Sequence, residues 1–523
     1  MGKSYVENSL KRFLKRKVKI TLGVVVTFLI TGAVSFAGES TVDAVGGASS
    51  GKWLAGIGES GKNLKAGKIE NDKITVQNTE KGNITITFKD TNQAIEIKNE
   101  ELSTEIIKNI NEAMTNAEKA VDWKNNITSR ENYEIGMNAE ATAEGNKAVD
   151  GQIIVNNNKI TNAEDTGKTT DKGEKLFAGQ TVLGHGTAVN KGDIEITKDS
   201  VNYFGQYIDG EGAEGYNYGN IILKNETPDK LTIERAQNAV NGGKIYNYGY
   251  IETVHHAQIV QNNSKAYNYG RLYSTSAYAQ FIDIQSVGYN YGMLETNGTA
   301  GQYVRDNSLG YNYGLIKNLG TAGQTANNKS EIYNYGVIIN NNNTGQSVAD
   351  NSVAYNYGMI ANKGQYGQYA ENSINYNYGL IANNGDVGQR GINSSNYNYG
   401  TIYNKGEIGQ TIENGDNYNY GLIVNIGNYG QTISKGESYN YGIIANKGNS
   451  GLNIGESGKG YNYGIIANKG DKGIHLYSDS TAATAYNIGI IANTGETNIF
   501  NLKNSMTYNE GILFNHKGII CCR

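Results

Sequence analysis

The chain has 523 residues, of which 46 are basic and 50 acidic, so its formal net charge is −4. The first 37 residues carry seven bases and one acid, a charge of +6, which leaves −10 for the rest. For a chain with this balance we expect no nucleic acid partner. The only two thiols, Cys521 and Cys522, are neighbours that bridge each other only with strain, so disulfides are not expected to hold the fold.

Residues 1–37 are predicted to form a secretory signal. Six basic side chains between positions 11 and 19 precede the apolar run 20–36, and small residues near its end indicate cleavage between Ala37 and Gly38. An uncleaved membrane anchor is the alternative, although this run of 17 residues is shorter than the about 20 that a spanning helix needs. In both cases we expect the bulk of the chain to leave the cytoplasm.

Residues 38–200 are expected to form a β-rich cap region ahead of the repeats. Apolar and polar residues alternate at 74–76, 84–88 and 94–97, as they do in half-buried strands. One helix is predicted near 100–123, and we expect it to cover the open N-terminal end of the fold. Its apolar residues, at spacings of three and four, are Ile106, Ile110, Met114, Ala117 and Val121.

A glycine-rich stretch at 56–62 has the spacing of a phosphate-binding loop. However, Asn63 stands where such a loop has Ser or Thr for magnesium, and the string Gly-Glu-Ser-Gly-Lys returns at 455–459 inside a repeat. These facts favour a plain turn over a nucleotide site. The repeat itself first becomes visible from Gln152 onward.

Residues 201–523 are organised around the tetrapeptide Tyr-Asn-Tyr-Gly. Including two degraded copies at Tyr486 and Tyr508 it occurs fourteen times, and eleven of the thirteen steps are 21 or 22 residues. This period is too short for a helix pair, and Gly and Asn are too frequent for stable helices. Stacking each unit on its neighbours at about 4.8 Å buries a continuous core, so the sequence predicts an all-β fold, a parallel β-helix or β-solenoid.

Fixed positions within each unit indicate two short strands and two turns, with a third strand too short to read. An aliphatic residue lies two positions after the motif Gly, and an Asn two positions further marks a strand running into a turn from Asn318 onward. Ten residues after the Gly a Gln begins the second strand. Stacked amides can bond along the rod, which predicts ladders through Asn356, Asn377, Asn398 and Asn419, and through Gln346, Gln368, Gln389 and Gln410.

The tyrosines are the candidate binding residues. If one straight strand runs through the motif, both Tyr point outward, and Glu510 at the second Tyr position agrees with an exposed site. Alternatively the chain turns at the motif Gly, and the rings stack inside or associate sideways with another rod. The predicted binding stripe consists of Tyr313, Tyr335, Tyr357, Tyr378, Tyr399, Tyr420, Tyr441 and Tyr463.

The leader, with its basic stretch at 9–19 and the apolar stretch 28–33, resembles that of large type V autotransporter surface proteins of Gram-negative anaerobes. The repeats resemble the passenger domains of that family. The resemblance implies a β-helical rod that a C-terminal β-barrel carries across the outer membrane, often for adhesion. Residues 511–518 open another repeat and the chain then stops, which departs from the family and predicts a passenger truncated before its barrel.

Catalytic chemistry is not expected, and no cofactor or metal is predicted. The five histidines, apart from one adjacent pair, are far apart in the sequence. Three function classes remain: an adhesive or structural surface passenger that contacts a host or bacterial cell-surface glycan or protein, a β-helix enzyme that acts on polysaccharide, and a non-adhesive periplasmic or membrane-tethered fragment. The first is favoured, with export to the outer membrane or the medium, and contact with a membrane only through the leader or a missing barrel.

Overall fold

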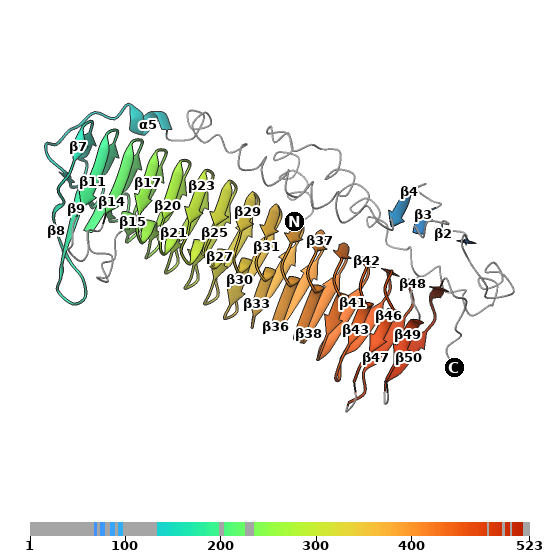
Figure 1. Cartoon of the computed structure of the whole chain (residues 1–523). Helices are drawn as coiled ribbons and strands as arrows, with labels where there is room; N and C mark the ends of the chain where they lie inside the picture. Colours follow the sequence, from blue (N-terminus) through green and yellow to red (C-terminus); the bar gives the residue numbers. More distant parts are fainter. Residues whose placement is uncertain are drawn as a thin grey trace.

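The computed structural model describes residues 67–70, 74–78, 84–88, 93–97, 133–197, 203–224, 235–478, 481–493, 497–502 and 505–515. The predicted signal segment, the helix near 100–123 and the glycine-rich loop at 56–62 lie outside the described residues. The described chain from residue 133 onward winds into one long solenoid, with one turn of chain, or rung, stacked on the next (Figure 1). This confirms the predicted all-β solenoid.

Each regular rung contributes three strands. We name them the Tyr strand, which ends at the motif Asn (β31, Val353–Asn356), the Ile strand after the motif Gly (β32, Met359–Asn362), and the Gln strand (β33, Tyr366–Glu371). The 16 Ile strands form one sheet, and the Tyr and Gln strands belong to a 31-stranded sheet. The third strand, which could not be read from the sequence, arises because the stretch after the Tyr strand bends and continues as the separate Ile strand.

The strands have the following bounds. The Tyr strands are β6 Ile153–Asn156, β10 Thr187–Asn190, β13 Glu214–Asn217, β16 Lys244–Asn247, β19 Lys265–Asn268, β22 Val287–Asn290, β25 Leu309–Asn312, β28 Glu331–Asn334, β31, β34 Ile374–Asn377, β41 Gly436–Asn440, β44 Lys459–Asn462, β47 Thr484–Asn487 and β50 Met506–Asn509. The Ile strands are β7 Lys159–Ile160, β11 Asp193–Thr197, β14 Asn220–Lys224, β17 Tyr250–Thr253, β20 Arg271–Ser274, β23 Met293–Thr296, β26 Leu315–Asn318, β29 Val337–Asn340, β32, β35 Leu380–Asn383, β37 Thr401–Asn404, β39 Leu422–Asn425, β42 Ile443–Asn446, β45 Ile465–Asn468, β48 Ile490–Asn493 and β51 Ile512–Asn515. The Gln strands are β9 Lys175–Leu183, β12 Tyr203–Asp209, β15 Arg235–Val240, β18 His256–Val260, β21 Tyr278–Ile282, β24 Ala300–Val304, β27 Ala322–Ala326, β30 Thr344–Ala349, β33, β36 Val387–Asn398, β38 Ile408–Asn419, β40 Tyr429–Ile433, β43 Ser450–Ile454, β46 Lys472–Leu476 and β49 Thr497–Asn501, where β36 and β38 run on into the next Tyr strand.

Successive rungs pair in parallel and in register. Tyr355 is opposite Tyr376, Ile360 opposite Ile381, and Gln368 opposite Gln389. Every such pair repeats a residue type at the same place on the rod, because a 21- or 22-residue step returns the chain to the same point of the next rung. Exact repetition in sequence thus becomes columns of identical side chains in space.

The interior is lined by alternate residues of all three strand types, as the period of two in a β-strand requires. One buried cluster runs along the Ile strands and includes Ile338, Ile360, Ile381 and Ile402, each fully buried. A second cluster runs between the Gln and Tyr strands, where Val348 and its equivalents lie two residues after the Gln. The predicted inward positions after the Gly and after the Gln are therefore both confirmed.

The motif does not form one straight strand, so of the two alternatives that the sequence left open, the chain takes the turn at the motif. Tyr357 and Gly358 lie in a bend between β31 and β32, and both of their N–H groups donate to the carbonyl of Asn334 on the previous rung, at 2.8 and 2.9 Å. A Cβ on Gly358 would lie 2.1 Å from the carbonyl oxygen of Gly336. The motif glycine is therefore required because each bend stacks on the bend of the rung before it.

The solenoid also starts earlier than the predicted boundary at residue 200. Strand β6 pairs in parallel with β10, and β10 with β13, so two rungs precede the first tetrapeptide. These rungs keep the ladder residues Asn156 and Asn190 but have Val155 and Val189 where later rungs have the first Tyr. They therefore lack the Tyr-Asn-Tyr-Gly motif by which the later rungs are recognised. Additional strands β5 (Lys147–Ala148) and β8 (Glu164–Thr169) pair with β9, and β8 does so antiparallel.

Further upstream, a separate four-stranded antiparallel sheet is formed by β1 (Gly67–Glu70), β2 (Ile74–Asn78), β3 (Ile84–Phe88) and β4 (Gln93–Ile97). Its last three strands coincide with the three stretches that alternate apolar and polar residues. The one helix of the described residues, α5 (Tyr133–Met137), comes directly before the first rungs.

Candidate functional site

The tyrosines of the motif form two parallel columns on the outside of the solenoid. The first Tyr belongs to the Tyr strand, where it alternates with inward residues such as Ala354 and Asn356 and so points outward. The second Tyr lies in the bend that follows. The structure thus combines parts of both interpretations of the sequence, because the chain turns at the motif while the rings still face outward.

Ring stacking along both columns is regular. In the first column, from Tyr216 to Tyr508, neighbouring ring centroids are 4.7 to 5.2 Å apart. In the second column, from Tyr218 to Tyr463, the distances are 4.8 to 5.0 Å. The two rings of one rung are also close, as in the pair Tyr355 and Tyr357 at 6.2 Å. The predicted stripe residues Tyr313, Tyr335, Tyr357, Tyr378, Tyr399, Tyr420, Tyr441 and Tyr463 all belong to the second column.

Each ring is covered by its neighbours above and below, which leaves edges and hydroxyls accessible. Tyr313, Tyr399 and Tyr441 are 40, 43 and 37% exposed, respectively. Burial, followed by the nearby charge of Glu331, raises the pKa of Tyr355 to about 12. Burial also raises the pKa of Tyr378 well above the value of a free phenol. The hydroxyls therefore remain neutral near pH 7 and can both donate and accept hydrogen bonds.

At its N-terminal end the second column is already in contact with a side chain from elsewhere in the same chain. The ring of Tyr133, at the start of α5, meets Tyr218 and Tyr248 edge-on at 5.2 and 5.3 Å. The hydroxyl of Tyr218 donates to the carbonyl oxygen of Tyr133 at 2.8 Å. Under this cover Tyr248 is only 2% exposed. The columns can thus accept an aromatic side chain edge-on together with a hydrogen bond from a phenol, which is a geometry that aromatic rings prefer.

The rigidity of the columns comes from amide ladders in the interior. The ladder Asn side chains from Asn156 to Asn487 each donate to the next rung at 2.7 to 2.9 Å, with Asn509 as the last acceptor, and the predicted members Asn356, Asn377, Asn398 and Asn419 belong to this ladder. The Gln side chains from Gln206 to Gln431 donate in the opposite direction, to the previous rung, at 2.6 to 3.0 Å, with Gln180 as the first acceptor, and include Gln346, Gln368, Gln389 and Gln410. All eight predicted members are fully buried.

A third ladder was missed by sequence reasoning. The Asn that ends each Ile strand, from Asn318 to Asn493, donates to its equivalent on the next rung at 2.8 to 3.0 Å. The sequence pattern placed this Asn where a strand runs into a turn, and it was not named among the predicted ladder residues. Its occurrence in every unit from Asn318 onward was the signal that would have identified it, because a turn alone tolerates Asp, Ser or Gly at such a position.

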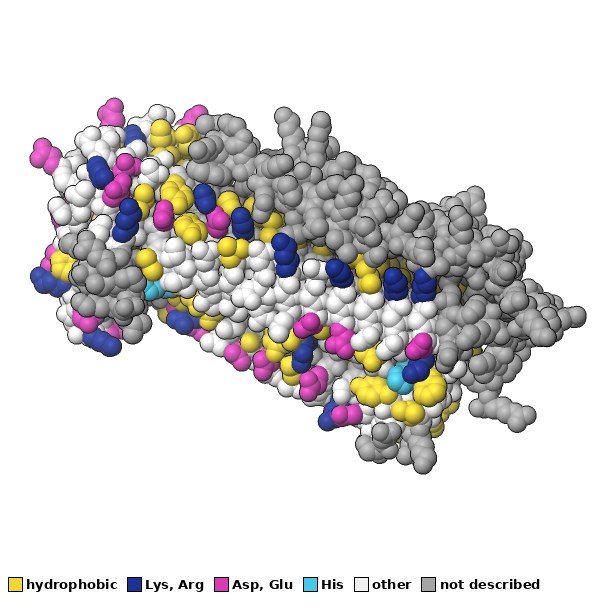
Figure 2. All heavy atoms as spheres, in the orientation of Figure 1, with side chains coloured by type: hydrophobic (Ala, Val, Ile, Leu, Met, Phe, Trp, Pro, Cys, Tyr) yellow, Lys and Arg dark blue, Asp and Glu magenta, His cyan; other side chains and the backbone are white. Residues whose placement is uncertain are grey.

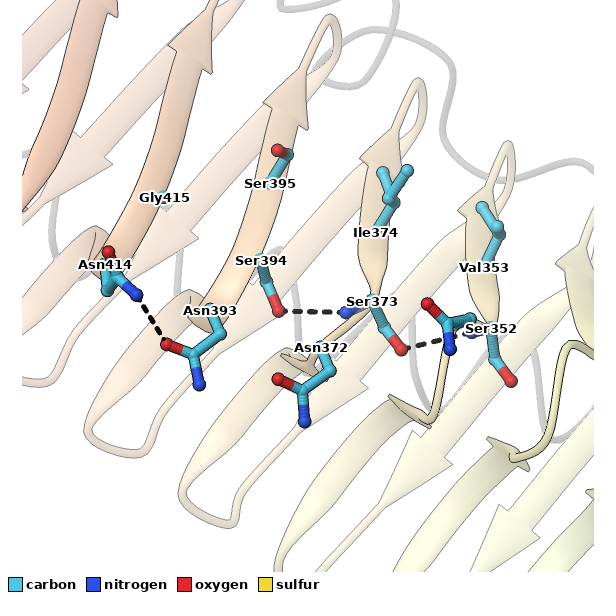
Figure 3. Close-up of a pocket in the computed structure, with 11 residues that line it drawn as sticks. Ser352, Val353, Asn372, Ser373, Ile374, Asn393, Ser394, Ser395, Asn414 and Gly415 are labelled. Atoms are coloured by element: carbon cyan, nitrogen blue, oxygen red, sulfur yellow. Dashed lines mark hydrogen bonds between the residues drawn. The ribbon is translucent and has the colours of Figure 1, made fainter.

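A polar groove of about 480 Å³ lies at the corner between the Gln and Tyr strands (Figure 3). Asn372, Asn393 and Asn414 line it with left-handed backbones, at φ of 48, 49 and 61°. The backbone N–H of Ser373 donates to Oγ of Ser394 at 3.1 Å, and the same bond recurs on neighbouring rungs. These groups bond to one another along the rod, which explains the recurring Asn-Ser pairs in the sequence as corner residues.

The remaining candidates for chemistry are dispersed. No cluster of His, Cys, Asp and Glu able to hold a metal ion occurs among the residues that the structure describes. His256 stacks on Tyr278 at 5.3 Å, and burial lowers its pKa to about 3, so it is neutral near pH 7. His516 and both cysteines lie outside the described ranges. Within those ranges no helix has the length and hydropathy needed to cross a membrane.

No protein-family model matches the chain, and neither a curated protein nor a solved structure matches it. The functional conclusions therefore depend on the geometry of the solenoid and on the sequence.

Proposed function

We propose that the chain is the exported passenger of an autotransporter-like surface protein, and that its tyrosine columns contact a glycan or protein on a host or bacterial cell. The observation that carries the proposal is the pair of outward columns with a ring spacing near 5 Å over at least eleven rungs. Monomeric proteins rarely expose a contiguous aromatic surface of this extent unless it binds something. The basic leader with its apolar run supports export.

The binding mode follows from repetition. One ring edge and one neutral hydroxyl offer a weak contact, but each rung repeats it at a fixed spacing. A ligand with repeated groups can engage several rungs at once, and linked weak contacts can raise the overall affinity by about 10² to 10⁴. Because the amide ladders hold the rungs in register, little order needs to be gained on binding.

The test uses the purified chain without residues 1–37 and its binding to cultured epithelial cells and to bacterial cells. Replacing Tyr357, Tyr378, Tyr399 and Tyr420 together by Ser should reduce binding at least about tenfold if four adjacent contacts are lost. The matched variant with four Phe keeps ring stacking and removes only the hydroxyls, so it separates hydrogen bonding from aromatic contact. Circular dichroism checks that both variants retain β structure.

Pretreatment of the cells identifies the class of ligand. Loss of binding after glycosidase treatment indicates a glycan, and loss after protease treatment alone indicates a protein. Equal binding by the wild type and the Ser variant, with both folded, would contradict the proposal and exclude the stripe as the contact surface.

A further inference from the structure

The outer surface of the Ile strands changes character along the rod. In each Ile strand the second and fourth residues face the interior, as Ile360 and Asn362 do, so the first and third face outward. Near the N-terminal end these outward positions carry charges, including the ion pair between Arg271 and Glu295. A sheet with charged side chains on its outer side can face the solvent.

From β29 onward the outward positions are apolar, with Thr401 as the exception. We call this surface the outer apolar face. It consists of Val337, Ile339, Met359, Ala361, Leu380, Ala382, Tyr403, Leu422, Val424, Ile443, Ala445, Ile465, Ala467, Ile490 and Ala492. A sheet whose outer side is apolar over eight rungs requires a cover, because an exposed face of this size is prone to association.

Ile339, Ala361 and Ala382 are 2, 1 and 3% exposed in the isolated chain, yet none of them is part of the interior clusters. We propose that residues 100–123 dock on the outer apolar face as an amphipathic helix, along the length of the rod. This replaces the expectation that the helix covers the N-terminal end of the solenoid.

The lengths agree. At 1.5 Å per residue, 24 helical residues span about 36 Å. The outer apolar face covers eight rungs, or seven steps of about 4.8 Å, which is about 34 Å. The apolar positions of the segment, Ile106, Ile110, Met114, Ala117 and Val121, recur at helical spacing and form one stripe of about 23 Å, about two thirds of the length of the face.

The connection is also long enough. Helix α5 fixes residue 133 on the rungs of Tyr218 and Tyr248, beside the bends that lead into the Ile strands. From the rung of Tyr248 to that of Tyr335 there are four steps, or about 19 Å. The nine residues 124–132 can span up to about 30 Å when extended.

Charge favours the same placement. Residues 100–123 contain six acidic and two basic side chains, a net charge of −4. The exposed Lys363, Lys405 and Lys447 each directly follow the Asn that ends an Ile strand, and so lie in a row beside the outer apolar face. Figure 2 shows such a row of basic side chains along the rod. The polar side of the docked helix would lie next to these cations.

Hydrogen exchange with mass spectrometry on the full chain tests the inference. Amides of residues 100–123 should be protected in the wild type, and replacing Ala361 and Ala382 by Glu should lower that protection by about tenfold or more while the Tyr strands stay protected. Replacing Ile110 and Met114 by Glu alters the other partner and should have the same effect without touching the solenoid. Thr411→Glu, an outward change on a Gln strand, serves as the control and should leave the segment protected.

The outcomes are distinct. A segment that exchanges freely in the wild type would overturn the inference, as would protection that survives both pairs of substitutions. If light scattering instead shows a dimer whose dissociation exposes the outer apolar face, a second copy is the occupant and residues 100–123 are not. None of these readouts depends on the cell-binding proposal.

Discussion

Replacing Asn377 by Leu removes one member from the middle of the motif Asn ladder. Asn377 is fully buried, accepts a bond from Nδ2 of Asn356 at 2.8 Å, and donates to Oδ1 of Asn398 at 2.8 Å. Its Nδ2 also donates to the carbonyl oxygen of Thr401 at 3.2 Å. Leu has the same number and branching of side-chain heavy atoms as Asn, so the substitution removes the amide groups and keeps the branched outline of the side chain.

The loss in the free energy of unfolding depends on which buried groups lose their hydrogen-bond partners. Oδ1 of Asn398 loses the donor of the ladder, which costs about 1 to 3 kcal/mol for a buried acceptor. Nδ2 of Asn356 keeps its bond to the carbonyl of Leu380 at 3.2 Å and therefore loses only one of two contacts. We expect a total loss of about 2 to 3 kcal/mol in the free energy of unfolding.

Urea denaturation followed by circular dichroism measures the loss, and hydrogen exchange locates it. Because solenoid stability is a sum of rung and neighbour terms, the rungs of Asn356 and Asn398 should open more readily than distant ones. Asn384→Leu, at an exposed corner one residue after β35, is the matched control and should change stability by less than about 0.5 kcal/mol. If both variants unfold at the same urea concentration, the ladder does not stabilise the rod and the reasoning is refuted.

Three other expectations follow from the packing. Gly358→Ala places a Cβ 2.1 Å from the carbonyl oxygen of Gly336, so thermal denaturation should show a loss of about 1 to 3 kcal/mol, and an unchanged melting temperature would show that the bend can relax. Ile381→Ala empties a fully buried site and should cost about 2 to 5 kcal/mol in urea, whereas a loss under 1 kcal/mol would mean that the rung collapses around the cavity. Burial raises the pKa of Tyr355 and Tyr403 to about 12, above the about 10 of unfolded tyrosine, so the stability they contribute is complete below pH 10 and is lost as the pH rises from 10 toward 12. Denaturation midpoints measured across that range should fall, and a flat profile would contradict the shifted values.

The sequence was sufficient for the fold because identical residues recur at a fixed period. Equivalents of Ile381 and Gln389 recur in successive units, and this recurrence alone marks both positions as inward. A period of 21 or 22 residues is too short for a helix pair and favours stacked strands. The amide ladders could be predicted for the same reason, since a polar residue at a constant inward position needs partners above and below it.

The local backbone geometry of the motif could be predicted less well than the fold. Whether the chain runs straight through Tyr357 and Gly358 depends on the distance between successive rungs, which the motif does not encode. The bend appears only when the carbonyl of Gly336 is placed next to Gly358. The repeat is traceable from Gln152 onward, but the boundary of the repeat region was predicted near residue 200 because Val155 and Val189 occupy the outward position of the first Tyr without displaying the motif.

The arrangement of the backbone bonds also determines how the rod responds to force. The hydrogen bonds between rungs run along the rod axis, so a pull between its two ends loads them in tension and opens them one rung after another. Each opened rung releases 21 or 22 residues of chain, or about 70 Å of extended length. Under the proposed function, the rod would lengthen many-fold under flow while its unopened rungs kept their tyrosine columns intact, and would thus hold a cell at a distance without releasing it.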